Sequence, residues 1–524
     1  MKYHSTRSRT DFVSGPEAII AGLAPDGGLY VPERLPAVNW RTLPTTYREL
    51  ARHILGLFFP EFSQSVLSRI IAGYNKFDSH EIVQLRDFDD YAFLELYHGP
   101  TASFKDMALS LLPGLLRESY RLTGRGETAF IMVATSGDTG SAALEGFAGQ
   151  EGTEIMVLYP DGGVSEIQQL QMEAVCDSNA HVFAIAGNFD DAQRAVKQAF
   201  VNTDIRQLAA KRSKDLSSAN SINIGRLVPQ IVYYFYAYQQ LVAARRIDEG
   251  AILDVSVPTG NFGDILAAIY AKAMGLPLGN IICASNTNKV LTDFFASGRY
   301  DSRREFAKTI SPSMDILVSS NLERYLHLLC EGDSELIAGC YRSLAESGCF
   351  DWPLDFPSDL RSKHKTDPET TALIRDAFVK YQYLIDPHTA VAYGAAELAT
   401  NYCLIVSTAS PYKFSDAVLA AVECSDESGD SASSAGVGVI AAADLKAGKK
   451  AAGEKAGEKA GQSTLTVETT GLTAKIERLE KLTDTTAPHS IRSKLKDFKL
   501  APTVLALEEI LPTIEQCVDG CSVK

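Results

Sequence analysis

The pattern of apolar and polar residues along the chain predicts a helix near its start and alternating strands and helices after residue 92. Between residues 47 and 58 the apolar positions recur at the three- and four-residue spacing of an amphipathic helix. Farther on, short apolar runs are followed by polar loops and then by helical segments. This order is typical of a largely parallel sheet covered by helices on both faces. We therefore expect an α/β fold with mostly parallel, twisted sheets.

Three repeats of this pattern place polar loops directly after strands. The strand runs are 129–134, 252–257 and 404–406, and the loops that follow them are 135–140, 258–264 and 407–409. Helical segments are expected from Ser141, from Ile265 and from Ser415. A strand that runs through glycines into a helix presents unpaired backbone N–H groups and the positive end of the helix dipole. Such loops suit phosphate or carboxylate groups.

Composition divides the chain into four parts. Residues 1–95 mix helical periodicity with turn signals, and we expect them to form a separate N-terminal cap domain. Residues 96–423 are expected to form a core of two α/β subdomains, which 467–524 completes. Between these parts, 424–466 consists mainly of Ala, Gly, Ser, Lys and Glu. Because this segment has few large apolar side chains to offset the entropy of ordering, we expect a disordered insertion.

Charge and composition exclude several classes of protein. The 524 residues carry a net charge of −15, which argues against nonspecific nucleic-acid binding, so an anionic ligand would need a locally positive site. No apolar stretch reaches the roughly 20 residues of a membrane span, and the first residues lack an apolar signal-peptide centre. The nine cysteines show no paired metal-ligand spacing. We expect a cytoplasmic protein without a metal site, and monomer and homodimer both stay open.

Lys105 is the first candidate for chemistry. It lies in the run 98–106, where Phe104 and the apolar residues after Asp106 offer an apolar environment. A nucleophilic lysine needs a depressed pKa, which the edge of an apolar pocket provides. The alternative is a solvated lysine at the start of an amphipathic helix.

Two glycine-containing loops could hold anions. In the 136–140 loop, the side chains of Ser136, Asp138 and Thr139 and the backbone beside two glycines could surround a carboxylate. An ordinary capped turn is the alternative. The second loop comprises Gly260, Asn261, Phe262, Gly263 and Asp264. It lacks the lysine of a P-loop and the dinucleotide spacing, so a single phosphate monoester fits it better, unless it is only a tight turn.

Further polar residues could complete a site. Ser221, Asn223 and Arg226 could converge on an anion if their segment is a loop that enters a helix, and a surface arginine beside a turn is the alternative. His388 could be an acid or base, but a structural histidine is the more frequent case. Pyridoxal phosphate (PLP) needs an aldehyde partner, a phosphate cradle and a polar group beside the ring nitrogen. Lys105, the 260–264 loop and Thr408 could supply them.

Taken together and in this order, the segments resemble the threonine synthase family, in the tryptophan-synthase-β-like fold type II group of PLP enzymes. The resemblance covers most of the chain. It rests on residues 3–7, 22–33, 98–106, 136–140, 220–226, 260–264, 388–390 and 407–409. Departures occur at Ala102-Ser103, where a more apolar pair is expected, and at Ser410, where family members often carry His. The insertion is also outside the pattern.

The resemblance implies a role for each candidate residue. Lys105 would link covalently to the cofactor, residues 260–264 would cradle its phosphate and Thr408 would face its pyridine nitrogen. Ser136, Asp138 and Thr139 would bind the substrate carboxylate, and Ser221, Asn223 and Arg226 its phosphate. The implied reaction converts O-phospho-L-homoserine and water to L-threonine and phosphate. A phospholyase that releases 2-oxobutyrate and ammonia, and a noncatalytic metabolite sensor on the same fold, are the alternatives.

Overall fold

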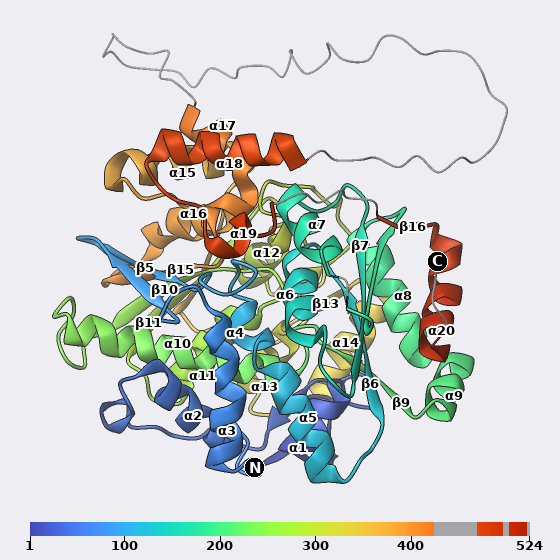
Figure 1. Cartoon of the computed structure of the whole chain (residues 1–524). Helices are drawn as coiled ribbons and strands as arrows, with labels where there is room; N and C mark the ends of the chain where they lie inside the picture. The colour runs from blue at the N-terminus through green and yellow to red at the C-terminus, as the bar shows by residue number, and fades with distance from the viewer. Residues whose placement is uncertain (176, 424–468, 496–501, 521–524) are drawn as a thin grey trace.

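Two mostly parallel sheets form the framework of the molecule (Figure 1). The computed structural model describes residues 1–175, 177–423, 469–495 and 502–520. The first sheet contains β6 (Thr128–Ala134), β7 (Thr153–Pro160), β8 (Ala180–Ile185), β9 (Lys214–Ser218) and β16 (Val504–Leu505). Their order is β16-β8-β7-β6-β9, and every neighbouring pair is parallel. β6 and β7 are buried along almost their whole length, which explains why they are nearly continuous apolar runs.

The second sheet has six strands. They are β4 (Gln84–Asp87), β5 (Tyr91–Glu95), β10 (Leu253–Pro258), β11 (Leu278–Ser285), β14 (Leu360–His364) and β15 (Cys403–Ser407). The order is β14-β11-β10-β15-β5-β4, and only the pair of β4 with β5 is antiparallel. The expected α/β class with mostly parallel sheets is confirmed. All three strand runs that the sequence predicts are present as β6, β10 and β15.

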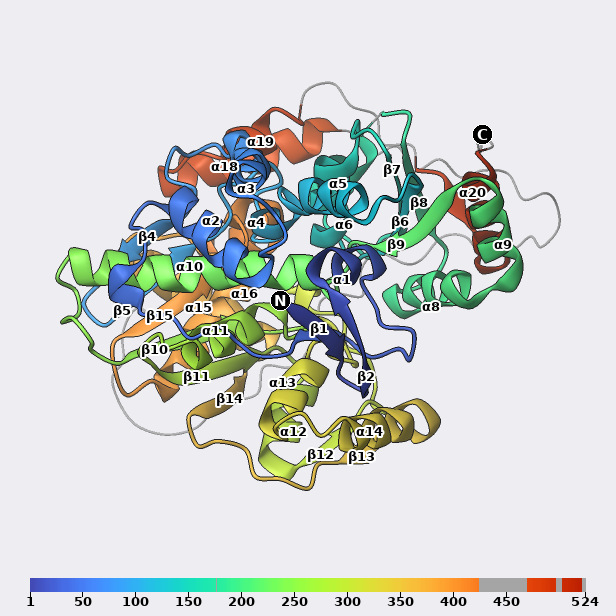
Figure 2. The ribbon, with the colours of Figure 1, turned by 90° about the horizontal axis from the view of Figure 1, so that it is seen from below.

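Helices surround both sheets (Figures 1 and 2). In chain order they are α1 (Gly15–Ala21), α2 (Tyr47–Phe58), α3 (Gln64–Ile71), α4 (Asp106–Leu109), α5 (Leu112–Thr123), α6 (Asp138–Phe147), α7 (Glu166–Glu173), α8 (Phe189–Val201), α9 (Thr203–Lys211), α10 (Ile224–Ala243), α11 (Gly263–Ala273), α12 (Val290–Ser297), α13 (Leu322–Leu329), α14 (Ser334–Ser347), α15 (Asp367–Tyr381), α16 (Pro387–Ala395), α17 (Ser415–Glu423), α18 (Thr469–Thr483), α19 (His489–Arg492) and α20 (Ile510–Asp519).

α10 is the central helix. Figure 2 shows it crossing the molecule between α2 and α11, and it packs against both. Most of its residues are buried, because apolar side chains occur on nearly every face. Its amino-terminal end therefore has a fixed position, and Arg226 lies in that first turn.

The N-terminal residues pack against the same core. β1 (Lys2–Ser5), β2 (Ser8–Ser14) and β3 (Tyr30–Pro32) form a small antiparallel sheet, and a two-stranded ribbon of β12 (Arg299–Asp301) and β13 (Cys349–Asp351) lies farther along. The helix expected at 47–58 is α2, with the same bounds. The domain boundary expected at residue 95 stays a prediction, although β4 and β5 on its N-terminal side pair within the second sheet.

The C-terminal segments join both halves of the molecule. α18 packs against α17, beside the helices of the six-stranded sheet, whereas β16 pairs with β8 and α20 packs against α8 and α9 (Figure 1). The expected insertion at 424–466 lies outside the described residues. Within the described ranges, no helix combines the length and the apolar character that crossing a membrane requires.

Two helices begin earlier than the sequence predicts. The helical segment expected from Ser141 starts at Asp138, because the Thr135 hydroxyl accepts hydrogen bonds from the N–H groups of Gly137 and Gly140 at 2.9 Å and closes the turn. Gly137 has φ +128°, which L side chains rarely adopt. The segment expected from Ile265 starts at Gly263.

Candidate active site

The Lys105 run pairs with the segment that follows β15. The N–H of Phe104 donates to the carbonyl of Thr408 at 2.7 Å, and the N–H of Ser410 donates to the carbonyl of Ala102 at 3.1 Å. Together with the antiparallel bridge between Ser103 and Ala409, these bonds fix the two segments side by side. Lys105 and Thr408, which are distant in sequence, therefore lie in one pocket.

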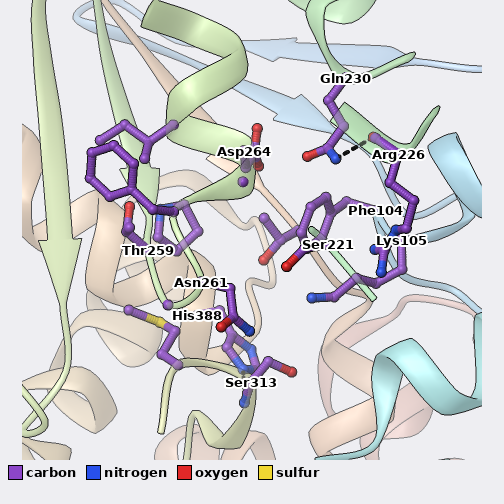
Figure 3. Close-up of a pocket in the computed structure, with 17 residues that line it drawn as sticks. Phe104, Lys105, Ser221, Arg226, Gln230, Thr259, Asn261, Asp264, Ser313 and His388 are labelled. Carbon is purple, nitrogen blue, oxygen red and sulfur yellow. Dashed lines mark hydrogen bonds between the residues drawn. The ribbon is translucent and has the colours of Figure 1, made fainter. Parts of the chain in front are cut away.

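This pocket lies at the carboxyl ends of β10 and β15 and at the first turns of α10 and α11 (Figure 3). Its predicted members are Lys105, Ser221, Arg226, Gly260, Asn261, Phe262, Gly263, Asp264 and Thr408. Ligand sites in open parallel sheets occur at the carboxyl ends of strands. Figure 3 shows the side chain of Lys105 extending into the space between these elements.

The environment of Lys105 favours its neutral amine. Burial and the nearby Arg226 lower the pKa of Lys105 to about 8, against the opposing effect of Asp138 and Asp264. The Lys105 amine also lies 4.6 Å from the centre of the Phe104 ring. An amine with this pKa is partly neutral at physiological pH, which is what nucleophilic or base chemistry requires.

Three polar atoms in the pocket wall have no hydrogen-bond partner in the described part of the chain. They are Nε of Arg226, Oε1 of Gln230 and Oδ2 of Asp264, and all are buried. Arg226 is 2% exposed and burial lowers its pKa to about 10, while its Nη1 donates to the carbonyl of Ala219 at 2.9 Å. Because buried polar groups are nearly always paired, this cluster indicates a site for a polar ligand that offers both acceptor and donor atoms.

The turn before α11 has the geometry of a phosphate site. Phe262, the residue before the helix, has left-handed backbone angles (φ 60°, ψ 16°) and is buried. A side chain at Gly260 would lie 2.8 Å from the carbonyl oxygen of Ser313, so only glycine fits this approach. The first N–H groups of a helix lack acceptors within the helix and attract anions.

Asp264 belongs to this turn and lines the pocket, and one oxygen of its carboxyl is hydrogen-bonded to α10. Its Oδ1 accepts hydrogen bonds from the hydroxyls of Tyr233 at 2.5 Å and Tyr234 at 2.6 Å. Burial raises the pKa of Asp264 to about 6, so the carboxyl is ionised at physiological pH but takes up a proton far more readily than an exposed aspartate.

Four of the residues predicted from the sequence do not line the pocket: Ser136, Asp138, Thr139 and Asn223. The Asp138 carboxylate forms an ion pair with Lys413 at 2.7 Å and accepts hydrogen bonds from Gln168 and Ser313. Burial opposes its ionisation, but Lys413 and His388 hold the pKa of Asp138 below its usual range. A carboxylate that is already paired would repel a substrate carboxylate, so the Asp138 side chain is unsuited to the expected role. The carboxylate-binding role of Ser136 and Thr139 stays a prediction.

Asn223 is engaged in structural contacts. Its Oδ1 accepts from the N–H of Gly225 at 2.9 Å and caps α10, and its Nδ2 donates to the carbonyl of Ile19 at 2.9 Å. Ser221 and Arg226, from the same predicted cluster, do line the pocket. The phosphate-binding role of Asn223 stays a prediction without support from this geometry.

Sequence reasoning missed Gln230, Ser313 and Met314, which also line the pocket. Gln230 lies one turn after Arg226, and its Nε2 donates to the Arg226 carbonyl at 2.6 Å. His388 lines the pocket, with Nδ1 2.5 Å from Asp386 and Nε2 accepting from the N–H of Ser313 at 3.2 Å. Both ring nitrogens are therefore engaged in hydrogen bonds, which agrees with a structural role for His388.

Comparison with known proteins extends this result. Residues 2–73 match the family model "Threonine synthase N terminus". The chain is 37% identical to the threonine synthase of Eremothecium gossypii over 469 residues, which cover 81% of this chain and 90% of the relative. It is also 39% identical to threonine synthase-like 1 of Homo sapiens, over 78% of this chain. The match spans only 58% of the length of that relative.

Solved structures share the whole architecture. The PLP-bound threonine synthase of Brucella melitensis superposes with a TM-score of 0.78 at 33% identity and covers 99% of both chains. The yeast threonine synthase gives a TM-score of 0.78 at 30% identity and covers 98% of both chains. The fold and the lysine pocket thus define a member of the fold type II class of PLP enzymes. Within that class, the chain belongs to the threonine synthase family.

Proposed function

We propose that the chain is a PLP-dependent threonine synthase that converts O-phospho-L-homoserine and water to L-threonine and phosphate. The observation that carries this proposal is the pocket around Lys105, where burial lowers the pKa of the amine to about 8. A lysine with these surroundings is suited to form a covalent bond with an aldehyde and to transfer protons.

The pocket residues fit the cofactor. The α11 turn from Gly260 to Asp264 would hold its phosphate, and Thr408 would face its ring nitrogen. The unpaired Nε of Arg226 is a donor that an anionic group of a ligand would satisfy. The unpaired Oε1 of Gln230 is an acceptor that a hydroxyl of a ligand would satisfy. When bound, PLP supplies an electron sink that stabilises negative charge at the carbon atoms next to the substrate amine.

Each side chain then has a task in the proposed reaction. The neutral amine of Lys105 removes and returns protons at the substrate carbons. Arg226, supported by Ser221, binds the phosphate that leaves, because a buried guanidinium gains most from an anion that neutralises it. The first N–H groups of α6, beyond Ser136, bind the substrate carboxylate. His388 and Asp386 hold the Ser313 segment against the pocket.

The kinship with threonine synthase-like 1 keeps a second activity open, a phospholyase that releases 2-oxobutyrate, ammonia and phosphate. Both reactions expel phosphate, and they differ in whether water adds to the remaining carbon skeleton. A noncatalytic sensor is the third alternative.

One assay separates the three. Purified protein with PLP is incubated with O-phospho-L-homoserine, and phosphate, threonine and 2-oxobutyrate are measured together. Threonine and phosphate in equal amounts support the proposal, and 2-oxobutyrate without threonine supports the phospholyase. No release of phosphate by the PLP-loaded protein would leave the sensor. Lys105→Ala is the control and is expected to release no product.

A further inference from the structure

Lys413 is a buried lysine that no prediction from the sequence included. It lies in the short 3-10 helix η5 (Pro411–Phe414), just after the Thr408 segment, and its side chain is 0% exposed. Its amine is 2.7 Å from Oδ1 of Asp138 and donates to the carbonyl of Thr101 at 2.8 Å. A lysine is almost never fully buried unless it is paired. These two contacts therefore account for the burial of Lys413, and the question is what they contribute to the site.

The contacts of Lys413 join three segments of the proposed active site. Thr101 belongs to the Lys105 run, and its N–H and hydroxyl donate to Asp106, the residue after Lys105, at 2.9 and 2.7 Å. Asp138 begins α6 and accepts a hydrogen bond at 3.1 Å from Ser313 in the pocket wall. Lys413 itself follows the Thr408 segment, which pairs with residues 102–104.

We propose that Lys413 is a positioning residue. Its ammonium group holds the Lys105 run, the first turn of α6 and the Thr408 segment in the one arrangement that directs Lys105 into the pocket. This inference rests on the proposed function of that pocket. Lys413 does not line the pocket and therefore acts through the segments that it connects.

A simpler role would be to neutralise Asp138. In that case any change that removes both charges would be tolerated. The second bond, to the Thr101 carbonyl, belongs to the positioning role alone, because that oxygen carries no formal charge and also accepts from Gln171 at 3.1 Å. The double variant Lys413→Met with Asp138→Asn therefore distinguishes the two roles. It should keep the parental kcat/KM if Lys413 only neutralises Asp138, and should lose it if Lys413 positions the segments.

The charges around Lys105 provide a readout that is independent of turnover. Arg226 on α10 and Lys413 on η5 lower its pKa, whereas Asp138 on α6 and Asp264 on α11 raise it, and His388 on α16 also lines the pocket. Lys413→Met removes one cation and leaves Asp138 unpaired. The pKa of Lys105 should then rise.

The experiment compares three variants with the parent protein: Lys413→Met, Lys413→Met with Asp138→Asn, and Lys214→Met. Lys214 is a matched control on β9, a buried lysine that pairs with Glu154 at 2.8 Å and donates to a backbone carbonyl at 3.3 Å. Cofactor-free protein is mixed with PLP between pH 6 and 10 and reduced with borohydride, and the adduct is quantified. Threonine formation and thermal unfolding are measured in parallel.

In Lys413→Met, the pH midpoint of adduct formation is expected to rise by about one unit, and kcat/KM for phosphohomoserine to fall at least about tenfold. The double variant is expected to regain thermal stability and the parent midpoint but to keep the low kcat/KM. Lys214→Met should retain the parent midpoint and kcat/KM. The positioning role is overturned if Lys413→Met keeps the parent midpoint and kcat/KM. It is also overturned if the double variant has the parental kcat/KM. If the parent forms the adduct but makes no threonine, the proposed function fails instead, and a parental midpoint in Lys413→Met still overturns the role proposed for Lys413.

Discussion

At the scale of single residues, the Lys105 pocket holds charges that are costly in the absence of a ligand. Burial lowers the pKa of Lys105 to about 8 and that of Arg226 to about 10, and it raises the pKa of Asp264 to about 6. All three shifts favour neutral forms, because the pocket solvates charge poorly. A bound anion would offset this cost for the cations of Lys105 and Arg226, so the groups suited to hold a ligand destabilise the ligand-free protein.

Lys105→Met is expected to stabilise the cofactor-free protein. The shift of the Lys105 pKa from 10.5 to about 8 corresponds to a penalty of about 3 kcal/mol. The sign follows from the lowered pKa, since the penalty is complete below pH 8 and disappears as the pH rises to 10.5. Urea unfolding at pH 7 and pH 10 tests this, and a methionine variant that is less stable than the parent at pH 7 contradicts it.

Arg226→Met is expected to raise the KM for phosphohomoserine. A hydrogen bond to a charged group contributes about 1.5–3 kcal/mol, or roughly 10–150-fold in affinity. The methionine fills similar space, so the cofactor-free protein should remain folded. Arg121→Met is the control, because Arg121 is exposed and pairs with Glu118 on its own helix. Equal KM values for the two variants would remove Arg226 from the phosphate site.

At the scale of elements, the start of α10 separates two roles that the sequence alone could not separate. Asn223 caps the helix and binds the N-terminal segment at Ile19, whereas Arg226 faces the pocket. Both residues have the polar chemistry of anion ligands, and only the direction of each side chain distinguishes them.

Asn223→Ala is expected to reduce stability more than substrate affinity. Loss of the cap and of the buried bond to Ile19 should lower the free energy of unfolding by about 2–4 kcal/mol. Asn188→Ala is the matched control, because Asn188 caps α8 at an exposed position and should cost about 1 kcal/mol or less. Unfolding in urea gives both values, and KM should change little in either variant. A KM effect as large as that of Arg226→Met would restore Asn223 as a phosphate ligand.

The elements also show what the sequence could predict. The runs at 129–134, 252–257 and 404–406 are strands, because apolar runs of that length need burial on both faces of a sheet. Ser313 and Met314 were not predictable, since they enter the pocket only through contacts between distant elements. Ser313, for example, reaches the site because His388 and Asp138 bond to it across 75 and 175 residues. Gln230 lies four residues after Arg226 on α10, so helical spacing from Arg226 could have found it.

At the scale of the whole molecule, α13 connects the N-terminal segment to the pocket. Glu323 accepts hydrogen bonds from Thr6 and pairs with Arg7 at 2.9 Å. The buried Arg324 donates to the carbonyls of Tyr30 and Ile222, the latter beside Ser221 in the pocket wall. The N-terminal residues are therefore anchored to the site through one helix.

Arg7→Ala is expected to weaken this anchor. It leaves the carboxylate of Glu323, which is 3% exposed, without its cation, and breaking such a pair costs about 3 kcal/mol. Arg41→Ala is the control, because Arg41 and Glu249 are 52% and 62% exposed and their pair contributes less than about 1 kcal/mol. Limited proteolysis should cut residues 1–30 of Arg7→Ala faster than those of Arg41→Ala, and equal rates would count against the anchor.

The account depends most directly on the covalent chemistry of Lys105. The measurement is mass spectrometry of peptides from protein that has been loaded with PLP and reduced with borohydride. The account predicts one phosphopyridoxyl group per chain, attached to Lys105 and absent from Lys105→Ala. An adduct on a different lysine, or none on the loaded protein, would contradict it.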